Sequence, residues 1–274
     1  MLQRQRSGSV LCPSCGKLVG VNDEQCYYCG RKKPGMWGFA AAFNRFGQGL
    51  GFQQAVIGGT FLLYLATLVA SSSIQNSGLS LLAPATRALI DFGASGAGPV
   101  FLADRWWTVL SAGWLHGGFL HIFFNAMWIR QLAPQTAELF GPGRMVILYT
   151  LSSVVGFAFS SAANWFLFQN PSHITVGASA AIMGLLGALV GYGRRTGSSV
   201  IGKEAWTYAV VLFLIGFLMA RVDNWAHAGG FIGGYLGSLW LDPRKEERAS
   251  HRLLAVLCLV LTAAAVIASL VIPA

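Results

Sequence analysis

Residues 176–193 read VGASAAIMGLLGALVGYG, an apolar run with glycine or alanine recurring every three or four positions. Small residues at this spacing let the backbones of neighbouring membrane helices approach closely. The hydroxyl of Ser179 lies about three residues inside the start of this run. A second run, residues 225–241, has a similar glycine pattern and carries His227 two residues inside its start. We therefore predict two closely packed helices that bring Ser179 within reach of His227.

A serine next to a histidine is the minimum equipment for nucleophilic catalysis, since the imidazole takes the hydroxyl proton as the oxygen attacks a carbonyl. Ionisable groups inside a membrane are costly and usually serve function. Each feature also has a simpler interpretation. A membrane serine often bonds to its own helix, a lone histidine can be a satisfied core residue, and glycines can serve packing alone.

The composition indicates an all-α integral membrane protein. Of 274 residues, 54% are hydrophobic and 11% are charged, whereas soluble domains carry about 25% charged residues. The mean hydropathy is +0.56. The net charge of +9 would suit nucleic acid, but no basic face with interleaved aromatic residues is present. We expect the lipid bilayer, and no nucleic acid, as a partner.

Charge also predicts the topology of seven transmembrane helices. Sixteen of the 19 Lys and Arg residues lie in the N-terminal arm and in alternate loops, Arg130 among them. The positive-inside rule then places the N-terminus in the cytoplasm and, after seven spans, the C-terminus outside. The predicted spans are residues 55–73, 108–131, 144–167, 176–193, 205–221, 225–241 and 252–272.

Polar residues gather in the outer half of three of these spans. The second span carries His116, His121 and Asn125, and the last two share one helix face because they are four residues apart. With Ser179 and His227 they predict a single site. His116 and His121 do not share a face well, so a metal site there is the weaker interpretation. His173, in the short loop before the fourth span, is expected to be solvated.

At these residues the chain resembles the rhomboid intramembrane serine proteases. The motifs are H116-GGFLHIFF-N125, G177-A-S179 and A226-H227 followed by Gly230 and Gly234, in this order. The resemblance implies a dyad without an acidic third member, in which Ser179 is the nucleophile and His227 the general base. It also implies that His121, Asn125 and the Ser179 N–H hold the oxyanion, and that His116 is a structural residue beside the site.

The N-terminal arm predicts a second module. Cys12-Pro-Ser-Cys15-Gly and Cys26-Tyr-Tyr-Cys29-Gly are two CxxC knuckles with ten residues between them. Four thiolates on two tight turns suit a tetrahedral zinc ion. We expect one structural zinc in a ribbon that resembles other zinc ribbons, with no metal used in catalysis. A dithiol redox switch is the alternative, and a cytoplasmic partner of the ribbon is possible.

These patterns divide the chain into four parts: a zinc ribbon (1–35), an interfacial linker (36–54), a rhomboid-like six-helix core (55–241), and a loop with a seventh helix (242–274). We predict a serine endopeptidase of the plasma (inner) membrane that cuts transmembrane proteins near the outer face. One alternative is an inactive rhomboid-like protein that binds transmembrane clients. A transporter is the other, but its polar groups should line the full depth of the membrane.

Overall fold

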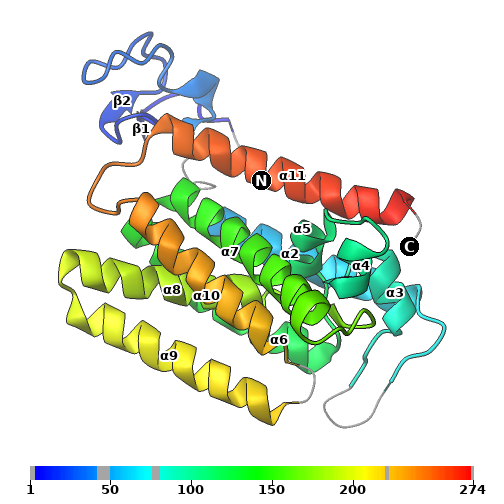
Figure 1. Cartoon of the computed structure of the whole chain (residues 1–274). Coiled ribbons are helices and arrows are strands. Elements are labelled where there is room, and N and C mark those ends of the chain that lie inside the picture. Colours follow the sequence, from blue (N-terminus) through cyan, green and yellow to red (C-terminus); the bar gives the residue numbers. More distant parts are fainter. Residues whose placement is uncertain (1–3, 42–49, 76–80, 220–221, 273–274) are drawn as a thin grey trace.

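The computed structural model describes residues 4–41, 50–75, 81–219 and 222–272, which are mostly helical (Figure 1). The long helices are α2 (Leu50–Val69), α6 (Phe119–Phe140), α7 (Pro142–Ala162), α8 (Ser179–Thr196), α9 (Ser199–Leu218), α10 (Asn224–Trp240) and α11 (Ala249–Val271). The short elements are β1 (Ser9–Leu11), β2 (Leu18–Gly20), η1 (Met36–Gly38), α3 (Thr86–Asp91), β3 (Ser95–Gly96), α4 (Ala97–Phe101), α5 (Thr108–Ser111), η3 (Ala112–Trp114), η4 (Ala163–Leu167) and β4 (Ile174–Thr175). Each predicted span overlaps one long helix.

Four described segments are long and apolar enough to cross a membrane: Gly51–Val69, Pro142–Leu167, Ser199–Leu218 and Ser250–Val271. Helices α6, α8 and α10 are the other three predicted spans. Helix α8 is buried along most of its length and contacts α6, α7, α9 and α10. A helix surrounded by protein needs less apolar surface than one facing lipid, so these three spans stay predictions from the sequence pattern.

The predicted boundaries of the second span were wrong. Residues 108–131 do not form one helix: α5 and η3 end before Gly117, and α6 then continues to Phe140. Arg130 therefore lies within α6 and not in a loop. The buried residues of α6 recur every three or four positions as far as Phe140, which keeps this amphipathic helix packed beyond the apolar run. Gly141, with φ +95°, ends it.

The linker predicted at 36–54 is only partly described. Its first residues form η1, and α2 begins at Leu50, five residues before the predicted start of the first span. Residues 42–49 of this linker lie outside the described ranges.

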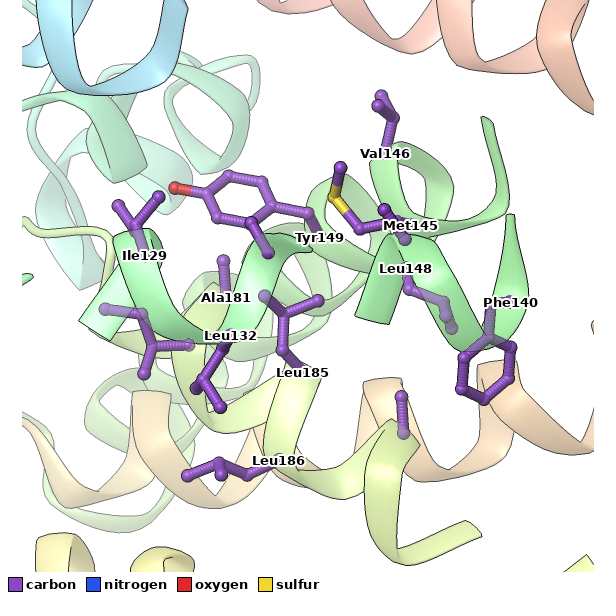
Figure 2. Packing of buried hydrophobic residues seen from close by; sticks show 14 of the residues in the cluster. Ile129, Leu132, Phe140, Met145, Val146, Leu148, Tyr149, Ala181, Leu185 and Leu186 are labelled. Carbon is purple, nitrogen blue, oxygen red and sulfur yellow. The ribbon is translucent and has the colours of Figure 1, made fainter. Parts of the chain in front are cut away.

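The hydrophobic core lies where α6, α7 and α8 meet. Side chains from the three helices interdigitate (Figure 2), and those drawn include Ile129 and Leu132 from α6, Leu148 and Tyr149 from α7, and Leu185 from α8. All five are at most 4% exposed. This packing makes α8 the central helix against which the others are fixed.

Two glycine stripes on α10 serve two different partners. A Cβ at Gly230 or Gly234 would overlap the backbone of α8, at the carbonyl groups of Ala180 and Gly184 respectively. A Cβ at Gly229 would instead meet α7 at the Gly156 Cα, 3.0 Å away, and the rest of its stripe, Gly233 and Gly237, also faces α7. The predicted close approach of α8 and α10 is confirmed. The second stripe explains why α10 also lies against α7 (Figure 1).

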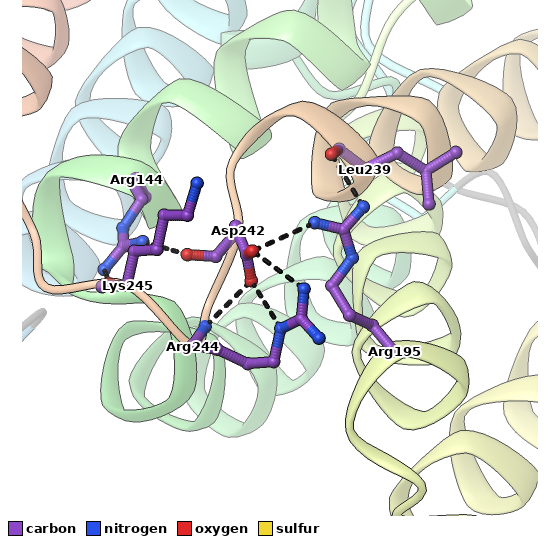
Figure 3. Close-up of polar contacts among 6 residues, drawn as sticks. All are labelled: Arg144, Arg195, Leu239, Asp242, Arg244 and Lys245. Carbon is purple, nitrogen blue, oxygen red and sulfur yellow. Dashed lines mark hydrogen bonds and ion pairs between the residues drawn. The ribbon is translucent and has the colours of Figure 1, made fainter.

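Ion pairs and hydrogen bonds connect the start of α7 and the end of α8 to the segment that follows α10 (Figure 3). The Asp242 carboxylate, just after α10, pairs with Arg244 at 3.0 Å and with Arg195 of α8 at 3.5 Å. Arg144 of α7, which is 3% exposed, donates to the carbonyl groups of Asp242 and Lys245. The Arg244 guanidinium, with a smaller contribution from Arg195, holds the pKa of Asp242 well below its usual range.

Helix α11 joins the N-terminal ribbon to the long loop between α2 and α6. Near its start, Arg252 donates to the carbonyl of Pro13 in the first cysteine knuckle. Near its end, the carbonyl of Ser269 accepts from Arg105 at 3.0 Å and its hydroxyl accepts from Trp107 at 3.1 Å. Arg105 is 1% exposed. Helix α11 is thus hydrogen-bonded to the ribbon near its start and to the long loop near its end.

Candidate active site

Ser179 is the first residue of α8, and a glycine turn places it there. Gly177 has φ +123°, a region that favours glycine. The N-cap residue, Ala178, provides no side-chain acceptor. The first N–H groups of a helix have no partner within the helix and carry partial positive charge. Ser179 therefore lies at a helix end suited to a developing negative charge.

His227 lies one turn from the contact between α8 and α10. Gly230 meets the backbone of Ala180, and His227 precedes Gly230 by three residues, which puts it on the same side of α10. Its ring is 6% exposed. Among the described residues no hydrogen bond joins the Ser179 hydroxyl to this ring. Such bonds are often long before substrate binds. Ser179 and His227 both lie within one helical turn of the contact between Ala180 and Gly230, and the dyad stays a prediction.

His121 and Asn125 both face the turn that precedes Ser179. A Cβ on Gly177 would lie within 2.5 Å of His121 Nε2 and 3.5 Å of Asn125 Nδ2. The Gly117 N–H donates to His121 Nδ1 at 3.3 Å, so in the neutral ring the proton sits on Nε2. Asn125 is 5% exposed, and its Nδ2 has no partner within the described part of the chain. Two donors therefore point toward the same place.

His116 packs beside this group. It is 1% exposed, and its ring lies edge-on to that of His121 with 5.0 Å between the ring centroids. Its predicted structural role matches this position, because a buried ring in contact with His121 restricts how that ring can turn.

Two residues near the site were not identified correctly from the sequence. Asp223 is the N-cap of α10, four residues before His227, and its carboxylate accepts hydrogen bonds from Trp225 N and Ala226 N. His173 is not fully solvated as expected: its side chain is 22% exposed and its Nε2 lies 3.7 Å from the Asp223 carboxylate. The Asp at the start of an apolar run is an ordinary N-cap signal that could have identified Asp223.

The four predicted metal ligands come together in the N-terminal ribbon. Both knuckles share one geometry, in which the glycine N–H after the second cysteine donates to the first cysteine's carbonyl at 2.8 and 2.9 Å. The four Sγ atoms lie within 4.8 Å of one another, with Cys12–Cys29 at 3.8 Å and Cys15–Cys26 at 3.7 Å. Four sulfurs about 2.3 Å from a tetrahedral ion would be about 3.8 Å apart. The residues therefore fit a zinc ion.

Comparison with known families agrees with the arrangement of these helices. The rhomboid domain matches residues 103–244, slightly more than half of the chain. The chain belongs to the rhomboid family. It is accordingly a multi-pass membrane protein, and rhomboid proteases act on transmembrane substrates in a membrane. The matched segment contains every residue described at the site, whereas the cysteine ribbon lies outside it.

Individual relatives include both proteases and an inactive protein. Rhomboid protease GluP of Bacillus subtilis (strain 168) is 30% identical over 64% of this chain and 34% of its own length. Putative rhomboid protease YdcA of the same organism is 29% identical over 53% of this chain and 71% of its own length. Inactive RHOMBOID-like protein 8 of Arabidopsis thaliana is 34% identical over 46% of this chain and 35% of its own length. The alignment with GluP thus spans about a third of that relative.

Proposed function

We propose that this rhomboid is an intramembrane serine endopeptidase that uses Ser179 as nucleophile and His227 as general base. The observation that carries the proposal is the convergence of two donors, His121 Nε2 and Asn125 Nδ2, on the turn that leads into Ser179. A buried amide left without an acceptor costs about 1–3 kcal/mol, so its retention is best explained by an acceptor that arrives with the substrate.

The reaction follows from these positions. Ser179 Oγ attacks the carbonyl carbon of a peptide bond while its proton moves to the His227 ring. The carbonyl oxygen becomes an oxyanion that accepts hydrogen bonds from His121, Asn125 and the Ser179 N–H, each worth about 2.7–4 kcal/mol. The protonated His227 then gives its proton to the leaving amine, and water releases the acyl group by the reverse sequence. Substrates are transmembrane proteins whose helix is locally unwound, because a helical carbonyl is already hydrogen-bonded.

The test is cleavage of a transmembrane substrate by the purified full chain in detergent, beside Ser179→Ala and His227→Ala. We expect both variants to lose cleavage. Ser199→Ala, a change of an exposed serine at the start of α9, is the matched control and should cut like the wild type. Cleavage that survives in Ser179→Ala would disprove the mechanism. Metal chelation should leave the cleavage chemistry intact.

A non-catalytic client-binding protein is the second candidate. The match to an inactive relative and the missing Ser179–His227 hydrogen bond favour it. It predicts that the wild type cuts nothing and that Ser179→Ala retains transmembrane clients as well as the wild type does.

We further propose that Cys12, Cys15, Cys26 and Cys29 hold one structural zinc ion. The spacing of the four sulfur atoms supports this. The ion would cross-link two turns of a ribbon that has only a small apolar core, which is where metal contributes most to folding.

The orientation stays a proposal from charge: N-terminus cytoplasmic and C-terminus outside, in the plasma membrane. Fusing a reporter that is active only outside the cytoplasm to each terminus tests it. We expect activity at the C-terminus alone, and activity at the N-terminus would reverse the topology.

A further inference from the structure

We propose that Asp223 is a positioning residue for the base: its carboxylate fixes the first turn of α10 and stabilises the positive charge that the His227 ring acquires. This inference rests on the proposed function, since it concerns the proton transfer from Ser179 to His227. It differs from a catalytic triad because Asp223 is one helical turn away along the same helix and makes no hydrogen bond to the ring among the described contacts.

The carboxylate is held from three sides. Its Oδ1 accepts from Trp225 N and Ala226 N, both at 3.0 Å. Its Oδ2 accepts from the hydroxyl of Ser160 on α7 and lies 3.7 Å from His173 Nε2. The side chain is only 11% exposed. Asp223 thereby joins α10, α7 and the loop that leads into Ser179, and it cannot move away without breaking these contacts.

The backbone places the His227 ring within the field of this carboxylate. The His227 N–H donates to the Asp223 carbonyl at 3.1 Å, and the Asp223 carboxylate accepts from the N–H of Ala226, the residue before His227, at 3.0 Å. A negative charge this close to the His227 ring favours its protonated form. In the described part of the chain no hydrogen bond or ion pair joins another carboxylate to the rings of His116, His121 or His227.

The other ionisable groups near this ring are imidazoles. His121 of α6 lies at the turn that precedes Ser179, with the His116 ring beside it, and a positive His121 would disfavour a positive His227. His173 faces the Asp223 carboxylate. Two uncharged groups also lie at the carboxylate: the Ser160 hydroxyl of α7 donates to Asp223, and the Asn164 amide of η4 donates to the Ser160 carbonyl at 3.0 Å.

The proton transfer creates a positive charge at this place. When Ser179 Oγ forms its bond to the carbonyl carbon, the His227 ring takes up the proton and becomes a cation that is 6% exposed. A buried cation without a counter-charge is strongly disfavoured. Asp223 supplies that counter-charge before the reaction starts, so no group must reorganise when the proton moves.

The experiment measures how fast a fluorophosphonate labels the full chain in detergent between pH 5 and 9. In this reaction Ser179 Oγ bonds to phosphorus, fluoride leaves, and the proton goes to His227, so no natural substrate is needed. Asp223→Asn removes the charge but keeps an equally good N-cap. Asp242→Asn makes the same chemical change at the other end of α10, about 22 Å from His227 at 1.5 Å per residue.

We expect Asp223→Asn to move the acid limb of the pH profile about 0.5–1 unit lower and to slow labelling on the plateau about tenfold. A neutral residue near the ring makes it harder to protonate, which gives the shift this sign. Asp242→Asn should leave the midpoint unchanged. A merely structural cap would leave the midpoint of Asp223→Asn at the wild-type value, and that result overturns the inference.

Failure of the proposed function gives a different pattern. If Ser179→Ala is labelled like the wild type, or the wild type is not labelled, the protease proposal fails and this inference fails with it. If labelling depends on Ser179 but the midpoint ignores Asp223, the inference alone fails. Asp223→Ala separates the two roles further: it should show the same shift of midpoint and, in addition, a lower thermal unfolding midpoint from the lost cap.

Discussion

Gly230→Ala tests whether the backbone contact between α8 and α10 builds the site. The added Cβ would overlap the Ala180 carbonyl group, with its carbon at 2.8 Å and the Ala180 Cα at 3.1 Å. Carbon atoms in contact prefer about 3.5–4.0 Å, so the helices must separate by roughly 1 Å. Overpacking of this kind costs about 1–3 kcal/mol, and the better helix propensity of alanine offsets about 1 kcal/mol of it.

The expected result is a loss of about 0–2 kcal/mol in stability and a much larger loss in activity. A displacement of 1 Å between catalytic groups can cost about 100-fold in rate. The assay pairs thermal unfolding in detergent with cleavage of a transmembrane substrate. Gly58→Ala on α2 is the matched control, since a Cβ there meets nothing within 4 Å. It should lower neither the thermal unfolding midpoint nor the rate of cleavage. If Gly230→Ala is as stable and active as the wild type, the close contact does not position the dyad.

Three further predictions follow from single residues. Asn125→Ala should lower kcat about 100- to 1000-fold without loss of stability, because the Asn125 Nδ2 has no partner within the described residues. A lower thermal unfolding midpoint that accompanies the loss of kcat would show a structural role instead. Asp242→Asn should lower the thermal unfolding midpoint at pH 7. Because the pKa of Asp242 is lowered in the folded protein, its charge stabilises the fold fully above the unfolded value of about 4 and progressively less as the pH falls from there toward the lowered pKa. The gap to wild type should therefore narrow below about pH 4, and a gap of constant size would mean that the Arg244 pairing is not its cause. We expect mass spectrometry to find one zinc ion per chain in the wild type and in Cys258→Ser on α11, and none in Cys15→Ser; retained zinc in Cys15→Ser would place the ligands elsewhere.

The sequence by itself determined the helical class and the residues of the candidate site. Long apolar runs admit one solution in a membrane, since every backbone group must be hydrogen-bonded within its own segment. The spacing of His121, Asn125, Ser179 and His227 on three runs was enough to predict that they gather. The two CxxC knuckles likewise predicted the cysteine cluster, because four thiols on two identical turns have few other arrangements.

The positions at which helices end could not be predicted from the sequence. The prediction that Arg130 lies in a loop was wrong, because it assumed that a charged residue ends an apolar span. In α6 the same charge sits on an exposed face, while the opposite face stays buried as far as Phe140. A helix that is partly covered by protein can carry charge along one side, and only knowledge of its neighbours shows which side.

Tertiary structure alone decided which partner each glycine stripe meets and what surrounds the base. The stripe with Gly230 faces α8, and the stripe with Gly229 faces α7, although both look alike in the sequence. Asp223 and His173 are 50 positions apart, and folding brings them to 3.7 Å. Local patterns report what a segment can bury, whereas the choice among equivalent faces depends on the packing of all helices at once.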